Sequence, residues 1–258
     1  EHRERQPLPL PRVAHVLARP ALERDRIEEL RDARRARRVA DEHAGLRDLA
    51  RGEAYVVLAA FLGAGEVVLC PSGYLSNAVA LEAVAGEFQR FFIDSDAHSS
   101  LTAPVGRLPQ EAVVAFRHLD PEDLERELRK RLRPGERPLV LTDGVVPVNG
   151  ELPPLGAYWQ AVRALGGTLL VDDAHGIGVI GPSGKGSPGE AGLPAESFIQ
   201  TGTLSKGLGA FGGFVAGPAG LVGKITEKSR TFVGATPIPP PIAAAAIRSI
   251  EILQGNPG

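Results

Sequence analysis

From about residue 55 onward, short runs of apolar residues alternate with segments of helical periodicity. Short apolar runs bounded by turn residues are typical of buried strands, and they occur at 67–70, 91–93, 139–141, 168–171 and 213–217. Helical spacing is found in the segments 74–84, 120–132, 155–165 and 242–253. Buried strands that alternate with helices predict a three-layer α/β fold, with a mostly parallel central sheet covered by helices on both faces.

Composition divides the chain into three parts. Residues 1–54 are charged and rich in arginine, most densely at 31–38, but acidic residues offset that charge at positions 23, 25, 28 and 29. No aromatic residue interleaves with the arginines, so a solvated helix face is favoured over a polyanion site. We expect an N-terminal helical, arginine-rich segment over 1–54, a large ligand-binding domain over 55–240, and over 241–258 the start of a further helix.

Bulk composition excludes several classes of protein. The 258 residues are 43% hydrophobic and 23% charged, with a net charge of −2, so neither nucleic acid nor an anionic membrane is an expected partner. The chain has one cysteine, Cys70, which fits a reducing cytoplasm. It has no methionine, so we expect it to be less than the complete primary translation product.

Polar residues gather where the expected strands end. Ser72, Asp94, Asp143, Asp172 and Lys206 each lie at or near the end of a strand or in the turn that follows. In parallel sheets, ligands bind beyond the carboxyl ends of the strands. Packing alone does not explain this convergence, so we expect a ligand site at that edge of the sheet.

The strongest chemical signal joins Lys206, Asp172 and His175. Lys206 lies in a glycine-lined turn, and Asp172 ends an apolar strand 34 positions earlier (206 − 172). Alone, Asp172 reads as a turn or cap residue and His175 as a loop histidine, but together with Lys206 they favour a site for pyridoxal phosphate (PLP). A lysine amine bonds the aldehyde of this cofactor, and a carboxylate keeps its pyridine nitrogen protonated. PLP is therefore the expected cofactor, and no metal is expected.

Ser72-Gly73-Tyr74 joins a strand to a helix, whose free N-terminal amides could bind the phosphate. Two other glycine-rich segments fail as nucleotide motifs. The segment 207–212 matches a dinucleotide fingerprint, but it opens a strand-like run instead of a helix. The segment 181–186 lacks both the first glycine and the metal-binding hydroxyl of a phosphate loop.

Four stretches carry a family resemblance: Pro71-Ser-Gly-Tyr-Leu-Ser-Asn77, Asp96-Ala-His-Ser-Ser100, Val171-Asp-Asp-Ala-His-Gly-Ile-Gly-Val-Ile-Gly181 and Thr201-Gly-Thr-Leu-Ser-Lys206. They resemble the α-oxoamine synthases, a family of fold-type-I PLP enzymes, over about residues 55–255. The resemblance implies the large domain of that fold and a homodimer with sites at its interface. It also implies condensation of an amino acid with an acyl-CoA or acyl-thioester, with loss of CO2, to give an α-amino ketone.

The resemblance also implies a role for each matching residue. Lys206 would bond the cofactor aldehyde, Asp172 would pair with the pyridine nitrogen and His175 would bond the ring hydroxyl. His98 would stack on the ring face. The phosphate end would be lined by Ser72, Gly73, Tyr74 and Thr203, and by Thr236 reaching across the dimer interface.

The chain departs from the family pattern in three places. Pro147, in the segment 142–150, stands where relatives have a serine that helps to orient the cofactor, and proline cannot donate a hydrogen bond. A glycine-, serine- and arginine-rich segment is not recognisable over 25–54. Relatives continue past the position of Gly258 into a smaller C-terminal domain, which carries the arginine that binds the substrate carboxylate. No residue here can be assigned that role, and we expect most of that domain to be missing from this chain.

Among the family's activities, residues 172–179 are most similar to 8-amino-7-oxononanoate synthase, an enzyme of biotin biosynthesis that uses alanine and a pimeloyl thioester. Glycine C-acetyltransferase and a PLP-dependent aminotransferase are alternatives within the fold. A truncated homologue that binds PLP or a partner without turnover is the alternative of another class.

Overall fold

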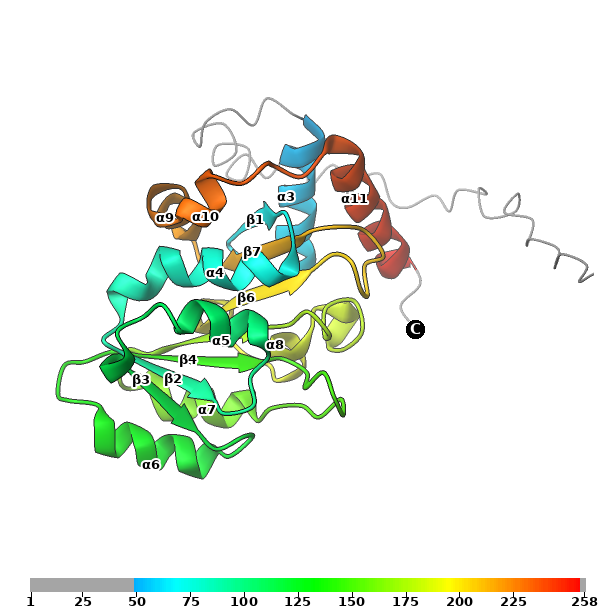
Figure 1. Cartoon of the computed structure of the whole chain (residues 1–258). Helices are drawn as coiled ribbons and strands as arrows, with labels where there is room; N and C mark the ends of the chain where they lie inside the picture. The colour runs from blue at the N-terminus through cyan, green and yellow to red at the C-terminus, as the bar shows by residue number, and fades with distance from the viewer. Residues whose placement is uncertain (1–48, 256–258) are drawn as a thin grey trace, which may run out of the picture.

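The computed structural model describes residues 49–255, which form an α/β domain around one seven-stranded sheet (Figure 1). The strand order is β1-β7-β6-β5-β4-β2-β3. Strand β7 is antiparallel to both of its neighbours, and the pairs from β6 to β3 are parallel. The strands are β1 (Glu66–Cys70), β2 (Arg90–Asp94), β3 (Val113–Phe116), β4 (Pro138–Asp143), β5 (Thr168–Asp172), β6 (Phe198–Thr203) and β7 (Gly213–Gly217).

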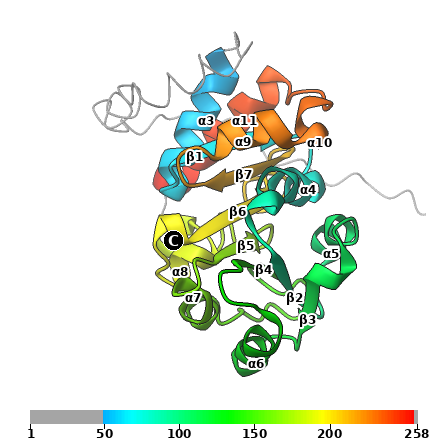
Figure 2. The ribbon, with the colours of Figure 1, turned by 90° about the vertical axis from the view of Figure 1, so that its left-hand side faces the viewer.

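Helices cover both faces of the sheet. One face carries α4 (Gly73–Val84), α5 (Ser99–Val105) and α9 (Leu221–Lys228). The other carries α6 (Pro121–Arg131) and α7 (Leu155–Arg163) over β2 to β5, and α3 (Leu49–Leu62) and α11 (Pro240–Gly255) over β1 and β7. Figure 2 shows α4 and α5 on one side of the strands and α7 on the other. The short helices α8 (Ser187–Glu190) and α10 (Arg230–Val233) lie in connections.

Continuous apolar strands form this sheet because both of its faces are buried. In β4, Leu139 and Leu141 pack beneath α4 and α5, whereas Val140 between them packs against α6 and α7. The expected three-layer, mostly parallel fold is therefore confirmed. Within the described part of the chain, no helix is long and apolar enough to cross a bilayer.

The strands expected at 67–70, 91–93, 139–141, 168–171 and 213–217 are all present, with bounds within two residues. The structure adds β3 and β6, which the apolar pattern did not predict. The helix expected near 242 begins at Pro240.

The domain boundary expected at residue 54 falls inside α3 and stays a prediction. The arginine-rich segment 31–38 lies outside the described residues.

Candidate active site

The carboxyl ends of β4, β5 and β6 bring the predicted site residues together. Asp143 is paired with Asp172 across β4 and β5, and Asp172 with Thr201 across β5 and β6. The connections that follow β5 and β6 carry His175 and Lys206, whose Nε2 and Nζ atoms lie 2.7 Å apart. Residues 31 positions apart in the chain thus meet at the sheet edge where a ligand was expected.

Asp172 is buried and held by side chains from two helices. Its Oδ2 accepts hydrogen bonds from Asn77 Nδ2 at 2.5 Å and from Ser100 Oγ at 2.7 Å. Its Oδ1 accepts a bond from the backbone N–H of Ala174 at 3.2 Å. These donors fix the orientation of the carboxyl group that is expected to face the pyridine nitrogen.

His175 is half-buried beside Lys206. Burial lowers the pKa of His175 below its usual range, and the neighbouring charge of Lys206 lowers it further. At neutral pH the imidazole is therefore uncharged, and Nε2 accepts the hydrogen bond that Lys206 Nζ donates.

The N-terminus of α4 provides an anion-binding surface. Ser72 caps the helix by accepting from the Leu75 amide, so the free amides at the start of the helix are those of Gly73 and Tyr74. Gly73 lies against Thr203 so closely that an added Cβ would be 2.7 Å from the Thr203 Cβ. The Thr203 hydroxyl donates to the Gly212 carbonyl at 2.9 Å and lies 2.7 Å from Ser205 Oγ, so two hydroxyls stand beside this helix end.

His98 occupies the position just before α5, at the rim of the same site. Its backbone N–H donates to Asp143 Oδ2 at 2.8 Å, and its Nδ1 lies 2.8 Å from Ser100 Oγ. Burial raises the pKa of Asp143 to about 7; the His98 bond opposes this rise, and the nearby charge of Asp172 adds to it. The His98 side chain itself is exposed.

Thr236 is not brought to the others by the contacts of the described chain. It is exposed in the connection between α10 and α11. Its predicted contact with a phosphate across a dimer interface stays a prediction.

The residues present fit PLP. The site combines a lysine amine beside a neutral imidazole, a buried carboxylate held by hydrogen-bond donors, and a helix N-terminus flanked by hydroxyls. The absence of a Cβ at Gly73 lets Thr203 lie against that helix end. Lys206, Asp172 and the Gly73 amide could thus hold the aldehyde, ring nitrogen and phosphate of one cofactor.

Three structural residues were not identified from the sequence. Asn77 and Ser100 lie inside the quoted stretches, but nothing there assigned them to Asp172. Asp173 was also given no role. It is fully buried and accepts from Ser187 Oγ at 2.8 Å and from Gln200 Nε2 at 2.7 Å, which ties the loop bearing His175 to β6.

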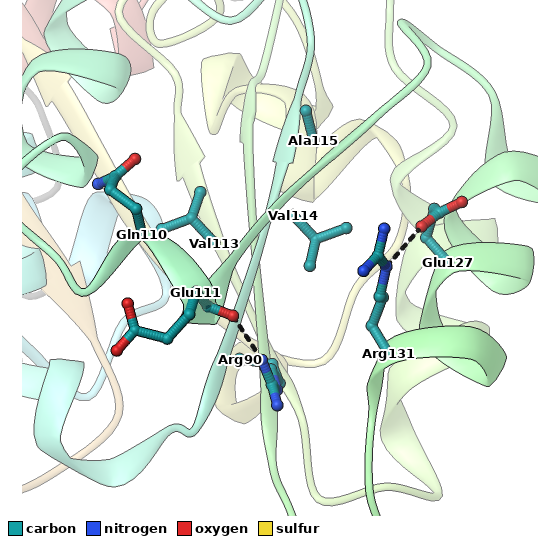
Figure 3. Close-up of a pocket in the computed structure, with 8 residues that line it drawn as sticks. All are labelled: Arg90, Gln110, Glu111, Val113, Val114, Ala115, Glu127 and Arg131. Carbon is teal, nitrogen blue, oxygen red and sulfur yellow. Dashed lines mark hydrogen bonds and ion pairs between the residues drawn. The ribbon is translucent and has the colours of Figure 1, made fainter.

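A cavity of about 460 Å³ lies elsewhere, along the edge strand β3 (Figure 3). Its two arginines are already engaged: Arg90 donates to the Glu111 carbonyl at 2.6 Å, and Arg131 pairs with Glu127 at 3.4 Å. None of the predicted site residues lines this cavity, so it lies apart from the candidate cofactor site.

Comparison with known proteins identifies the family of the chain. Residues 53–256 match the family "Aminotransferase class I and II". The 8-amino-7-oxononanoate synthase of Symbiobacterium thermophilum is 35% identical over 200 residues, which are 78% of this chain and 51% of that protein. The chain thus spans about half the length of this curated relative.

Solved structures show the same fold. Serine palmitoyltransferase of Sphingomonas wittichii superposes with a TM-score of 0.74 and 29% identity, covering 85% of this chain and 57% of that one. The 8-amino-7-oxononanoate synthase of Francisella tularensis has a TM-score of 0.69 at 20% identity, over 85% and 63% of the two chains.

Proposed function

Because this chain belongs to the aminotransferase class I and II family and its relatives are α-oxoamine synthases, we propose that it forms the PLP-binding part of a PLP-dependent acyltransferase. This enzyme would join an amino acid to an acyl-CoA or another acyl thioester, with loss of CO2, and release an α-amino ketone. The first activity to assay is 8-amino-7-oxononanoate synthesis, which is the activity in the names of its relatives.

One observation carries the proposal: Lys206 Nζ lies 2.7 Å from the neutral His175 imidazole, on the sheet edge where Asp172 is buried. When bound, PLP withdraws electrons from the bond that breaks at the amino acid α-carbon. Lys206 Nζ would hold the cofactor aldehyde and carry the proton taken from that carbon. Asp172 would keep a negative charge at the ring nitrogen, and His175 Nε2 would orient the lysine amine.

Two further roles follow for the remaining residues. The amides of Gly73 and Tyr74, with the Thr203 hydroxyl, would bind the phosphate at the α4 N-terminus. Thr236 would complete the phosphate site from the second subunit of a homodimer. A light-scattering mass equal to a single chain under assay conditions would contradict the homodimer.

The cofactor is tested by the visible spectrum of the purified protein with added PLP, before and after borohydride. We expect absorbance that borohydride converts to a permanent adduct in the wild type and in Lys228→Ala, which removes an exposed lysine of α9. Lys206→Ala should bind PLP without forming the adduct. Adduct formation in Lys206→Ala, or none in the wild type, would refute the assignment.

The reaction is tested by offering alanine or glycine with an acyl-CoA and measuring CoA release beside 2-oxo acid production. CoA release that depends on the amino acid supports the acyltransferase. Production of a 2-oxo acid without thioester consumption would instead identify an aminotransferase. Neither product from a PLP-loaded protein would identify a homologue that binds the cofactor without turnover.

A further inference from the structure

Ser100 lies between His98, which is expected at the face of the PLP ring, and Asp172, which is expected at the ring nitrogen. Its Oγ lies 2.8 Å from His98 Nδ1 and 2.7 Å from Asp172 Oδ2. A third contact joins this oxygen to Asn77 Nδ2 at 3.0 Å. Ser100, Asn77 and Asp172 are all buried, so water does not replace the contacts among these three, whereas the His98 side chain is exposed.

The orientation of Asn77 is fixed by Thr201. The Thr201 hydroxyl donates to Asn77 Oδ1 at 2.5 Å, which turns the amide NH2 group towards Asp172 and Ser100. Both amide protons are then used, one on Asp172 Oδ2 and one on Ser100 Oγ. Asn77 can therefore only donate to the serine hydroxyl.

The remaining hydrogen bonds follow from counting protons. A serine hydroxyl has one proton to give and can accept two bonds. The ionised carboxylate of Asp172 can only accept, so the Ser100 proton lies towards Asp172. The contact with His98 then requires a proton on Nδ1, which donates to Ser100 Oγ.

A second contact of His98 marks the alternative state. The backbone N–H of Ser100 lies 3.2 Å from His98 Nδ1 and can donate to it only when Nδ1 carries no proton. The Ser100 hydroxyl would then point to Nδ1, and Asp172 Oδ2 would have to carry the proton. In that state the imidazole proton lies on Nε2, so the two states differ in the tautomer of His98 and in one proton on Asp172, which comes from solvent.

We propose that Ser100 is a positioning residue that couples the protonation of His98 at Nδ1 to the negative charge of Asp172, with Asn77 and Thr201 fixing the direction of the bonds. In the state with ionised Asp172, the His98 ring is held with its Nδ1 proton directed inward at Ser100 Oγ. The consequence for the cofactor rests on the proposed function, whereas the hydrogen-bond arrangement belongs to the protein alone.

The tautomer is tested by NMR of protein labelled with 15N in the histidine rings, with His98→Gln identifying the signal. We expect Nδ1 of His98 to be protonated in the wild type. In Ser100→Ala the backbone amide is the remaining neighbour of Nδ1, so the proton should move to Nε2. Ser100→Thr keeps the hydroxyl and should restore the wild-type tautomer.

The matched control is Ser99→Ala, which removes an exposed hydroxyl from the adjacent position of α5. It should leave the His98 tautomer unchanged. An unprotonated Nδ1 in the wild type would overturn the proposal, and so would the same tautomer in the wild type and Ser100→Ala. If Ser100→Ala does not fold, the wild-type tautomer and Ser100→Thr still decide the question.

A second measurement is the PLP dissociation constant, followed by absorbance. Loss of a hydrogen bond to a buried charge should weaken PLP binding by Ser100→Ala about tenfold or more, and Ser99→Ala should match the wild type. Unchanged PLP affinity in Ser100→Ala would refute the coupling. A wild-type protein that binds no PLP would refute the proposed function, while the tautomer measured without cofactor still tests the proposal.

Discussion

Replacement of Asp173 by asparagine should change how the stability of the domain depends on pH. Burial raises the pKa of Asp173 from 3.8 to about 7, against the lowering effect of its bonds from Ser187 and Gln200. In the unfolded chain the carboxyl has its ordinary pKa. Between about pH 4 and pH 7 the folded state therefore holds one proton more than the unfolded state, so the free energy of unfolding falls as pH rises.

The size of the effect follows from the width of that window. One pH unit corresponds to about 1.4 kcal/mol for one proton. Between pH 5 and pH 7 the wild type should thus lose about 2 kcal/mol of stability relative to Asp173→Asn, which has no titrating group there. Asp143, whose pKa is also raised to about 7, is present in both proteins and cancels in the difference.

The assay is urea unfolding at pH 5, 6, 7 and 8, followed by the fluorescence of Trp159, the single tryptophan. Asp96→Asn is the control because Asp96 is exposed, and its curve should run parallel to that of the wild type. A stability difference between wild type and Asp173→Asn that stays constant over this range would refute the reasoning.

Three further predictions test the site and its support. Gly73→Ala should destabilise the domain by about 1–3 kcal/mol and weaken PLP binding in an absorbance titration, because the new Cβ would press on Thr203. Asp172→Asn should lower kcat roughly a hundredfold while PLP absorbance shows retained binding. Burial raises the pKa of Glu82, but hydrogen bonds, chiefly from Thr231, outweigh burial and lower this pKa below its usual value. The ionised Glu82 therefore stabilises the folded state, and this stabilisation is lost as the pH falls through its pKa. Glu82→Gln should accordingly flatten the acid side of a melting-temperature profile.

The sequence predicted those strands whose side chains are apolar, and β6 shows why it missed others. Gln200 and Thr201 interrupt any apolar run in β6, yet both are buried. Gln200 bonds to Asp173 and Thr201 bonds to Asn77, so each polar group finds a partner in another element. A pattern read along one strand contains no information about such partners.

In the site, too, some residues are recognisable from the local sequence, and others only from their partners in the fold. Lys206, His175 and Asp172 could be identified because their chemistry and their positions after strands point to one cofactor. Asn77 and Ser100 lie 95 and 72 positions from Asp172, and neither side chain is diagnostic by itself. Only the packing of α4 and α5 on the sheet brings their donors to that carboxylate.

The position of β7 has a consequence for how the chain is made. β1, the first strand of the sheet in the chain, pairs with β7, the last, and Glu66 lies opposite Gly217. Among the helices that the structure describes, the first, α3, likewise packs on the last, α11 (Figure 1). During synthesis, β1 has no β7 to pair with and α3 has no α11 to pack on until these late segments leave the ribosome. Closing a loop of that length is slow, so we expect nascent chains to depend on chaperones until synthesis has passed α11.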